Sequence, residues 1–353
     1  MDLEAQHVES LSSTHNKLQV KDFIWSENEW PTVAHDDFDS GEDIPIISLS
    51  NRSRNDDECY KKLCKDMVTA CERWGFVRVV DHGVAPETVE NMKRRCLEMF
   101  DLPMEVKMKG TRSTCMPLGY SASNLDYGHN LPWAEIIQLL QSPQHVVGFA
   151  KKVYGDKYQL FSDAITDYMN AMDGLGMVIL ETLAHGLGLP HDFFTKNFNK
   201  EKESTMIRVN RYPPCPLPER CLGLGSHSDP HTLTILLQDD VGGLQVQKGE
   251  GVWVGVRPIP NSFIINIGDT FEAWSNGRLK SVVHRAVVNR EKKRLSVAYF
   301  MSPASETIID CPLELVGNGY RKYKPFTWSD FRSQLLLQRR VVGKTALFPY
   351  LLP

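Results

Sequence analysis

The sequence predicts a mainly β protein with flanking helices, whose strands form a sandwich or a barrel. The first observation is a series of short runs after residue 205 that are rich in β-branched and aromatic residues and are separated by turn residues. The second is a long apolar stripe at helical spacing that comes before these runs. The expected strands are Met206–Tyr212, Thr232–Gln238, Leu244–Val246, Trp253–Val256, Ser262–Ile267, Val282–Val288 and Leu295–Phe300.

Strands and helices alternate nearer the start of the chain. Ile44–Leu49 is a short apolar run that predicts a strand, and Cys59–Arg73 repeats its apolar residues at helical spacing. The aromatic and β-branched run Trp74–Asp81 predicts a second strand. Pro86–Phe100 restarts a helix with a proline near its beginning. Residues 101–155 are rich in glycine, proline and serine, so we expect them to be irregular and to cover a site.

One long helix is expected before the β-rich region. Its apolar stripe runs from Phe161 to Leu183 in steps of three and four residues, and glycines followed by a proline end it. Near the C-terminus, Thr327 is expected to cap a helix that runs from Trp328 to about Arg339.

The chain is expected to consist of four parts. These parts are a poorly ordered leader at 1–40, an N-terminal region at 41–155, the long helix with the β-rich domain at 156–340, and a tail at 341–353. The leader ends in an extended arm, and we expect the rings of Phe23, Trp25 and Trp30 in this arm to pack on the body of the protein.

The composition is that of a globular chain and narrows the function classes. Of 353 residues, 42% are hydrophobic and 24% charged, and 40 basic against 44 acidic residues give a net charge of −4. This mild acidity gives no reason to expect a nucleic acid or a membrane surface as partner. Eight irregularly spaced cysteines are expected to be reduced thiols. Without a recognisable signal peptide or membrane span, we expect a cytoplasmic protein, by default a monomer, that acts on a small molecule.

Two histidines and an aspartate in the β-rich region form a candidate metal site. His227 and Asp229 are two residues apart, so on an extended segment their side chains point to the same side. His284 lies on another expected strand. Two histidines and one carboxylate are the facial triad that holds Fe(II) and leaves adjacent coordination positions open, which a co-substrate and dioxygen can take.

A second pair of side chains lies on the next expected strand. Arg294 and Ser296 share one face, and a guanidinium beside a hydroxyl is suited to bind a carboxylate through charge-assisted hydrogen bonds. A short dicarboxylate such as 2-oxoglutarate could chelate Fe(II) at one end and meet Arg294 and Ser296 at the other. The order and spacing of these residues favour this joint interpretation over an accidental one.

Other interpretations of the same region are open. His227 and His231 could be zinc ligands, although no glutamate lies between them and Pro230 disfavours the helix that such a pair requires. Cys215 and Cys221 could bind zinc with His227, but no fourth ligand has regular spacing. A structural β-scaffold with an accidental triad and a non-catalytic protein that binds a small molecule are further alternatives.

The chain resembles the plant 2-oxoglutarate- and Fe(II)-dependent dioxygenases over roughly residues 40–340. The resemblance rests on IPIISL, CERWGFVRVVDHGV, RVNRYPPCP, GLGSHSDPHTLTILLQDDVGGLQV, IPNSFIINIGDTFEAWSNGRLKSVVHRAVVN and KKRLSVAYFMSP. The sequence departs from the family pattern at Ser48 and Asp81, where aspartate and asparagine are usual, and at Arg211, where tyrosine is more usual. The first two departures are expected to be structural, and the Arg211 side chain is expected to face away from its neighbours on the strand.

The resemblance implies a fold, a set of site residues and a set of co-substrates. The implied fold is a double-stranded β-helix, or jelly roll, backed by helices. The residues that match the family's iron ligands are His227, Asp229 and His284, and those that match its 2-oxoglutarate clamp are Arg294 and Ser296. By the same resemblance, Tyr212 hydrogen-bonds 2-oxoglutarate and Asn210 lies near the iron. Fe(II), 2-oxoglutarate and dioxygen are then required, with ascorbate as the reductant, and no side chain beyond the metal ligands is expected to act as a catalyst.

Several segments are most similar to the gibberellin oxidases of the 2-oxidase or 20-oxidase type: SNGR-x-KS-x-x-HRAVVN, IGDTF, LPW at 131–133 and FIW at 23–25. The resemblance therefore implies hydroxylation or stepwise oxidation of a diterpenoid carboxylic acid. A dioxygenase of flavonoid or alkaloid metabolism, or an oxidase of this fold that does not use 2-oxoglutarate, is the alternative. The side chains expected in the substrate pocket, with core packing as the alternative for each, are Tyr120, Trp133, Phe271, Glu272 and Met301.

Overall fold

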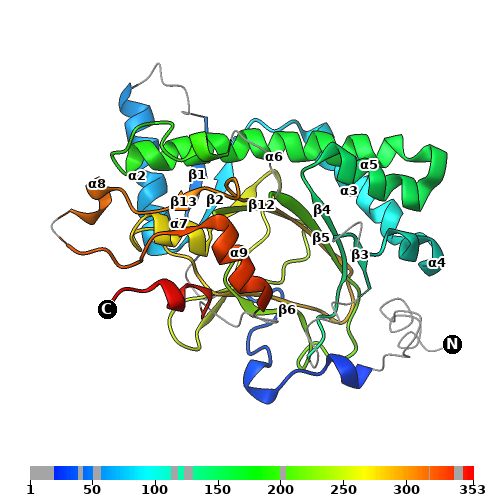
Figure 1. The fold of residues 1–353 in the computed structure, drawn as a ribbon. Helices are drawn as coiled ribbons and strands as arrows, with labels where there is room; N and C mark the ends of the chain where they lie inside the picture. Colours follow the sequence, from blue (N-terminus) through cyan, green and yellow to red (C-terminus); the bar gives the residue numbers. More distant parts are fainter. Residues whose placement is uncertain are drawn as a thin grey trace.

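The computed structural model shows two β-sheets, with helices covering the outer face of the larger one (Figure 1). It describes residues 20–38, 43–50, 57–112, 118–122, 130–198, 204–317, 319–337 and 345–353. The large sheet consists, in spatial order, of β1 (Ile46–Ser48), β2 (Phe76–Val80), β10 (Phe263–Ile267), β7 (Leu233–Gln238), β12 (Arg294–Met301), β5 (Met206–Tyr212), β4 (Glu135–Leu140) and β3 (Tyr120–Ser121). The small sheet consists of β6 (Leu222–His227), β11 (His284–Val287), β8 (Leu244–Gln247) and β9 (Trp253–Gly255).

Nearly all of these strands pair in the antiparallel direction. In the two sheets, β1 and β2 are the one parallel pair, and a separate antiparallel pair is formed by β13 (Ile308–Ile309) and β14 (Phe326–Thr327). The predicted class, mainly β with flanking helices, is confirmed, and the two sheets enclose a cavity as expected for a jelly roll. Chain segments that are far apart in the sequence therefore meet inside the sandwich.

The helices lie mainly on one side of the molecule (Figure 1). The longer ones are α2 (Asp57–Arg73), α3 (Pro86–Phe100), α5 (Pro143–Tyr154), α6 (Gln159–Gly186) and α9 (Trp328–Leu337), and the shorter ones are α4 (Met104–Lys107), α7 (Asp269–Trp274) and α8 (Leu313–Val316). Short 3-10 turns lie at η1 (Val20–Phe23), η2 (Glu27–Glu29), η3 (Met108–Gly110), η5 (Gly155–Lys157), η6 (Thr195–Asn197) and η7 (Thr345–Tyr350). Helix α6 carries the predicted apolar stripe and packs on β7 and β12, while α2, α3 and α5 pack on α6.

Close packing of α6 on the sheet depends on one small residue. Gly176 of α6 lies so near β12 that a β-carbon there would come within 1.9 Å of Met301 Sδ. The Met301 side chain therefore fills the layer between helix and sheet, where it is 1% exposed. A larger residue at position 176 would push the helix away from the sheet.

The predicted helix near the C-terminus is confirmed, and the segment after it packs on the body. Thr327 Oγ1 accepts a hydrogen bond from the backbone nitrogen of Asp330 at 3.1 Å, which is the expected cap of α9. In the tail, the ring of Tyr350 contacts the ring of Phe326 at 4.3 Å between centroids. This contact fixes η7 against β14.

The expectation that residues 101–155 are irregular is wrong for β4 and α5. Strand β4 has the sequence EIIQLL, which is too short to be assigned from its own pattern and becomes a strand by pairing with β5. Helix α5 begins with Ser142 Oγ accepting from the backbone nitrogen of His145 at 3.4 Å, with Pro143 in its first turn.

Strand β6 and helix α7 were also not predicted. The glycines of β6 lower its intrinsic preference for a strand, which pairing with β11 overrides.

The arm that precedes β1 packs on the small sheet. In Figure 1 this arm, drawn in dark blue, lies beneath β6, on the side of the molecule away from α6. Phe23 and Trp25 are buried, Phe23 against the ring of Trp133 at 4.9 Å, and Trp25 Nε1 donates to the backbone oxygen of Leu131 at 3.1 Å. The expectation of a poorly ordered leader over residues 1–40 is therefore wrong for residues 20–38, which include η1, η2 and the packed arm, while residues 1–19, 39 and 40 lie outside the described residues.

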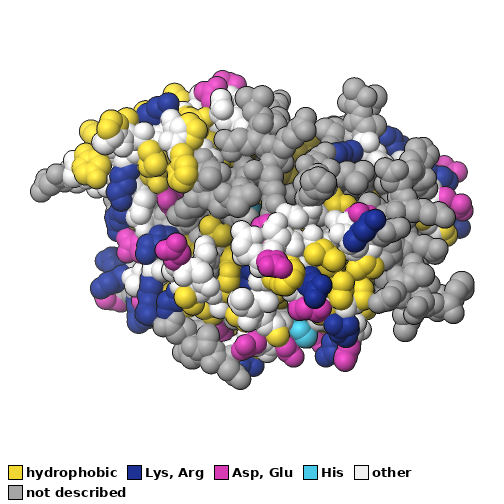
Figure 2. Space-filling view, turned by 90° about the horizontal axis from the view of Figure 1, so that it is seen from below, with side chains coloured by type: hydrophobic (Ala, Val, Ile, Leu, Met, Phe, Trp, Pro, Cys, Tyr) yellow, Lys and Arg dark blue, Asp and Glu magenta, His cyan; other side chains and the backbone are white. Residues whose placement is uncertain are grey.

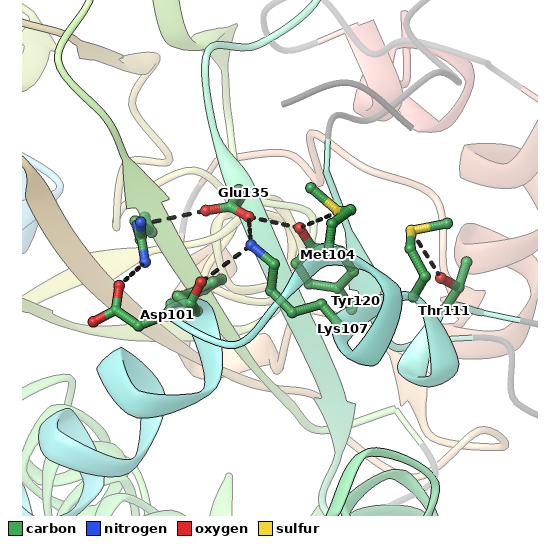
Figure 3. Close-up of polar contacts among 9 residues, drawn as sticks. Asp101, Met104, Lys107, Thr111, Tyr120 and Glu135 are labelled. Atoms are coloured by element: carbon green, nitrogen blue, oxygen red, sulfur yellow. Dashed lines mark hydrogen bonds and ion pairs between the residues drawn. The ribbon is translucent and has the colours of Figure 1, made fainter. Parts of the chain in front are cut away.

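A buried ion cluster fastens the segment after α3 to the large sheet (Figure 3). Glu135, the first residue of β4, is fully buried and accepts hydrogen bonds from Lys107 Nζ at 2.5 Å and from Tyr120 OH at 2.6 Å. Arg211 Nε approaches the second oxygen of Glu135 at 3.4 Å, so this side chain faces away from Asn210 and Tyr212, as predicted, and lies on the side of the sheet that the helices cover. Burial, together with the charge of Glu135, raises the pKa of Tyr120, which keeps its hydroxyl protonated as a donor.

The ion cluster yields a stability prediction. Lys107→Met is expected to lower the free energy of unfolding by roughly 3–5 kcal/mol, because it leaves the Glu135 carboxylate buried without its closest cation. Adding Glu135→Leu in the same chain is expected to recover much of the loss, because no buried carboxylate remains. Urea unfolding of the single and double variants measures both values. A single-variant loss below about 1 kcal/mol, as for an exposed pair, would contradict the assignment of a buried pair.

The molecular surface is mixed in character. On the face that Figure 2 shows, acidic and basic side chains are interspersed, with hydrophobic side chains between them. Leu313, Tyr320 and Phe348 are among the exposed large hydrophobic residues. Of the helices in the described part of the chain, none combines the length and the apolar character that crossing a membrane requires.

Candidate metal centre

Three side chains from the small sheet and its adjoining turn converge at one end of the cavity. His227 is the last residue of β6 and His284 the first residue of β11, and the two face each other directly across that antiparallel pair. Asp229 follows β6 by two residues. One potential ligand atom from each of the three residues lies within 4.8 Å of the others. Among the described residues, this is the one cluster of histidine, cysteine or carboxylate groups that could hold a metal ion.

Backbone carbonyls orient the two imidazole rings. His227 Nδ1 is 2.8 Å from the backbone oxygen of Gly225, and His284 Nδ1 is 3.1 Å from the backbone oxygen of Val282. A ring nitrogen that donates to a carbonyl must carry the proton, so the lone pair is left on Nε2. Both Nε2 atoms point toward Asp229, with Oδ1 of that residue at 3.5 Å from His227 and 3.7 Å from His284.

The carboxylate of Asp229 is held on one oxygen and left available on the other. Its Oδ2 accepts hydrogen bonds from Thr234 Oγ1 at 2.6 Å and from Asn266 Nδ2 at 2.7 Å. Thr234 lies on β7 and Asn266 on β10, so the large sheet supplies both donors. Because both donors bind Oδ2, Oδ1 is free to face the imidazoles and to act as a monodentate ligand.

The surroundings hold Asp229 and His284 in the protonation states that metal binding requires. Burial by itself would raise the pKa of Asp229, but the neighbouring His284 and His227 and the donor Thr234 together hold it well below its usual range. Burial, followed by the proximity of His227, lowers the pKa of His284 to about 4. At neutral pH the aspartate is therefore an anion and His284 a neutral base, which are the states in which these side chains coordinate metal ions.

The structure disfavours the two zinc interpretations. His231 does not join the cluster, because its Nδ1 lies 2.7 Å from Ser302 Oγ and its ring stacks on Phe300 at 4.7 Å. Cys215 and Cys221 are buried in an apolar cluster with aromatic side chains and are free thiols, like the other cysteines among the described residues. Two nitrogen donors and one carboxylate oxygen with an adjoining cavity match a facial Fe(II) site better than a closed four-ligand zinc site.

A buried arginine lies further along the cavity. Arg294, the first residue of β12, is opposite Tyr212 of β5, and Ser296 is opposite Asn210. Ser296 Oγ is 3.3 Å from Asn210 Nδ2 and 3.4 Å from Tyr212 OH. The antiparallel register therefore brings together the four side chains that the family resemblance connects with 2-oxoglutarate.

The guanidinium of Arg294 has hydrogen-bond donors that no described protein group accepts. Arg294 is 3% exposed, and its Nη2 donates to Gln238 Oε1 at 3.3 Å, while Nε and Nη1 are buried without a partner. Its charged group lies over the ring of Tyr212, 4.9 Å from the centroid. Unsatisfied donors on a buried cation are costly, so this geometry fits a site for an anion such as a carboxylate.

A glycine next to the arginine is required by the packing. Gly243 has a φ of +113°, and a β-carbon there would lie 2.7 Å from the backbone oxygen of Val287 and 3.3 Å from the Arg294 side chain. A larger residue would therefore strain the backbone and displace the guanidinium.

The metal cluster and the arginine line one cavity of about 220 Å³ between the two sheets. Its walls combine apolar and polar side chains from strands of both sheets. The lining residues other than those already described at the site include Phe76, Gln138, Met206, Arg208, Leu224, Pro230, Leu236, Leu244, Ala298 and Phe300.

The structure does not bring the five expected substrate-pocket residues to this cavity. Tyr120 belongs to the ion cluster around Glu135, and Trp133 donates from Nε1 to the backbone oxygen of Pro213 at 3.0 Å in a separate apolar cluster. Each of the others fills the interior elsewhere. Phe271 packs on Phe194, Glu272 accepts from Ser281 N and Tyr323 OH, and Met301 lies against Gly176 of α6.

Met206, Arg208, Phe300 and Gln138 are among the cavity-lining residues that were not predicted from the sequence. Met206 and Arg208 alternate with Asn210 along β5, so the two-residue period of a strand could have identified them. The same period applied to Ser296 identifies Phe300 on β12. Gln138 gave no signal, because it lies on β4, in the segment that the sequence predicts to be irregular.

Comparison with known proteins identifies similar families, proteins and structures. Residues 203–303 match the 2OG-Fe(II) oxygenase superfamily, and residues 44–156 match the N-terminal family of the non-haem dioxygenase in morphine synthesis. Gibberellin 20 oxidase 1 of Arabidopsis thaliana is 36% identical over 88% of this chain and 82% of its own length. Naringenin,2-oxoglutarate 3-dioxygenase of Matthiola incana is 36% identical over 83% of this chain and 81% of its own length.

Two solved structures extend the comparison to the fold. The crystal structure of JOX2 in complex with 2OG, Fe and JA covers 98% of this chain and 97% of its own, with a TM-score of 0.80 and 32% identity. The rice dioxygenase for auxin oxidation covers 88% of this chain and 100% of its own, with a TM-score of 0.72 and 28% identity. Both matches confirm the double-stranded β-helix fold that the sequence resemblance implies.

Proposed function

Because the chain belongs to the 2OG-Fe(II) oxygenase superfamily, we propose that His227, Asp229 and His284 are its Fe(II) ligands and that Arg294 and Ser296 bind the far carboxylate of 2-oxoglutarate. The enzyme class, an oxidoreductase of the dioxygenase type, follows from membership of the family. The observation that carries the residue assignment is the convergence of three ligand atoms within 4.8 Å beside a buried arginine with unpartnered donors.

Each side chain has a defined task in this proposal. The two histidines present their Nε2 atoms, and Asp229 presents Oδ1 while the sheet holds its other oxygen. Tyr212 and Asn210 hold the Ser296 hydroxyl beside Arg294, so that a carboxylate meets a preformed set of donors. Fe(II) bound with 2-oxoglutarate supplies the dioxygen chemistry, and the side chains supply orientation and exclude water.

The proposed substrate is a gibberellin-type diterpenoid acid, which the enzyme hydroxylates or oxidises in steps. The proposal is supported by the gibberellin 20 oxidases of Arabidopsis thaliana and Triticum aestivum, several of which are 36% identical to the chain over more than four fifths of its length. The cavity also suits an alicyclic acid, because apolar residues such as Met206, Leu224 and Phe300 share its walls with polar ones.

A flavonoid substrate is the second candidate. The naringenin dioxygenase of Matthiola incana is as similar to this chain, at 36% identity, as the gibberellin oxidases are. A flavanone has no carboxylate, whereas a gibberellin carries one, so the two substrate classes require different side chains in the cavity. Direct competition between them in one assay separates the candidates.

The purified full-length protein can be assayed with Fe(II), 2-oxoglutarate and ascorbate against a panel of gibberellins, flavanones and alkaloids. Mass spectrometry follows the oxidised product, and succinate is quantified in the same reaction. We expect oxidation of at least one gibberellin acid, with succinate formed in step with product. Product formation without 2-oxoglutarate would contradict the co-substrate assignment, and exclusive oxidation of flavanones would contradict the gibberellin assignment.

Thr234→Val tests the support of Asp229. The change removes the donor at 2.6 Å from Oδ2 and keeps the volume of the side chain, so the carboxylate loses part of its orientation. Changes of this kind typically weaken metal binding by about 10- to 100-fold, and we expect an effect near the lower end because Asn266 still donates. Anaerobic titration with Fe(II) measures the affinity. An unchanged affinity with unchanged turnover would contradict this role of Thr234.

A further inference from the structure

Arg208 also borders the cavity, and it has no role in the proposed Fe(II) and 2-oxoglutarate sites. Arg208 lies on β5 and is half-buried, and its side chain borders the cavity near Gln138 and Ala298. We infer that Arg208 is the receptor for an anionic group of the substrate, a carboxylate in the proposed gibberellin-type acid, an inference that rests on the function proposed above. Arg208 is then a specificity-determining residue.

The position of Arg208 separates it from the 2-oxoglutarate clamp. Along β5, the side chains of Tyr212, Asn210 and Arg208 point to the same side of the sheet, and across the pairing with β12 they face Arg294, Ser296 and Ala298 in turn. Four residues of strand correspond to roughly 13 Å. Arg208 and Arg294 therefore lie at different positions along the cavity, and each can bind its own anion at the same time.

The charge of Arg208 is not neutralised by the protein. Among the described residues, no carboxylate lies within ion-pair distance of its guanidinium, and its buried Nη2 has no hydrogen-bond partner. Asp229, the one carboxylate among the residues that line the cavity, is already engaged by Thr234 and Asn266. A cation with a free donor inside a small cavity favours an anionic ligand.

Two other arginines near the site are held by other protein groups. Arg285 also borders the cavity and has a buried Nη2 without a partner, but its guanidinium lies 4.0 Å from the centroid of the Trp253 ring, its Nε donates to Gln245 at 2.8 Å and its Nη1 donates to the backbone oxygen of Glu29 at 3.4 Å. Arg211 belongs to the ion cluster on the helical side of the large sheet. Of the described arginines that border the cavity outside the proposed 2-oxoglutarate clamp, Arg208 is therefore the one whose guanidinium is held by a hydrogen bond to a neighbour on its own strand and not by an aromatic ring or the N-terminal arm.

The protein holds Arg208 in place through the same hydrogen bonds that orient the clamp. Its Nε donates to Asn210 Oδ1 at 2.8 Å, which requires that the amide nitrogen of Asn210 point the other way, toward Ser296 Oγ at 3.3 Å. With Ser296 Oγ accepting from Asn210, its hydroxyl hydrogen is free to bind a carboxylate. One side of Arg208 is thus anchored, and the remaining donors are presented to the cavity in a fixed direction, which reduces the entropy lost on binding.

The test compares a gibberellin acid with its methyl ester, because the ester keeps the shape and removes the negative charge. For the wild-type protein we expect the ester to have the higher KM, by about 10- to 100-fold, as the loss of one charge-assisted interaction predicts. Arg208→Gln is expected to raise the KM of the acid to that of the ester, and to raise the co-substrate KM by a smaller factor, because the change also removes the donor to Asn210 Oδ1. Calorimetric binding of the acid to anaerobic protein loaded with Fe(II) and 2-oxoglutarate gives the same comparison without turnover.

Two further variants make the result specific. Arg208→Lys keeps the charge but not the fork, so it is expected to retain an intermediate preference for the acid, and it also decides the question if the glutamine variant does not fold. Arg290→Gln changes an exposed arginine far from the cavity lining and is expected to behave as wild type.

The outcomes distinguish a failure of the inference about Arg208 from a failure of the proposed gibberellin substrate. If the wild-type protein oxidises acid and ester equally well, or if Arg208→Gln weakens both by the same factor, the inference about Arg208 is wrong while the proposed function stands. If the wild-type protein oxidises only neutral flavanones, the gibberellin proposal and the inference about Arg208 both fail. Acid preference that disappears in Arg208→Gln supports both.

Discussion

Protein that carries His284→Ala is expected to lose both its tightly bound iron and its turnover. His284 supplies one of the three proposed ligand atoms, and no other histidine, cysteine or carboxylate among the described residues joins that cluster to replace it. Loss of an outer hydrogen-bond partner of a metal ligand typically costs about 10- to 100-fold in affinity, so the loss of a direct ligand is expected to exceed about 100-fold. Iron content after anaerobic dialysis and succinate formation with 2-oxoglutarate measure the two effects.

Controls separate loss of the ligand from loss of the fold. His284 is buried and its ring contacts Phe76 at 5.4 Å between centroids, so a cavity at this position also costs some stability. His284→Gln retains most of the volume and is expected to lose iron equally, with a smaller change in melting temperature. His35→Ala, on the N-terminal arm and away from the metal cluster, is expected to keep iron and turnover. Full activity and normal iron content in His284→Ala would refute the ligand assignment.

Arg294→Lys is expected to weaken the binding of 2-oxoglutarate, with a rise in the co-substrate KM by about 10-fold or more, while iron affinity changes by less than about twofold. Lysine carries the same charge but presents a single nitrogen, whereas the arginine presents donors on three nitrogens of a planar fork, two of which, Nε and Nη1, are buried without a partner. The lysine also loses the planar contact with the Tyr212 ring. The predicted selectivity for the co-substrate follows because Arg294 is not one of the three metal ligands.

Steady-state kinetics with varied 2-oxoglutarate, together with an iron titration of the same preparation, tests the role of Arg294. Arg290→Lys is the matched control, because Arg290 is exposed and pairs with Glu219 at the surface. An unchanged co-substrate KM in Arg294→Lys would remove this residue from the proposed clamp. A large fall in iron affinity with an unchanged KM would place the arginine in the support of the metal centre instead.

Local patterns in the sequence predicted the elements whose signal lies within their own residues. Helix α3 has the predicted bounds, because a proline at its start and an amphipathic period are local features. Strand β5 likewise has the predicted bounds, and the cap of α9 is the predicted threonine. By contrast, β4 and β6 depend on partners, β5 and β11, that lie about 70 and 60 residues further along the chain. Their short sequences do not specify a strand without those partners.

The proposed metal ligands could be predicted because the residue types and their spacing indicate the chemistry of the site. His227 and Asp229 had to point to one side of an extended segment, and the family resemblance connected them with His284 and with the pair Arg294 and Ser296. The substrate pocket was not predictable in the same way. The five expected pocket residues turned out to pack in the interior outside the cavity, because aromatic and apolar side chains are equally suited to a core and to a pocket.

Residue types and local spacing were enough to define the donor atoms of the site, the direction in which each strand presents them and the mainly β class of the fold. They did not define which faces of the strands border the cavity beside the proposed metal centre. That was set by the register between strands distant in sequence, which placed Arg208 and Gln138 beside the cavity and turned Arg211 and Glu135 to the helical side. The side chains of a strand alternate between its two faces whatever surrounds the strand, but the packing of the whole core decides which of the two faces is buried.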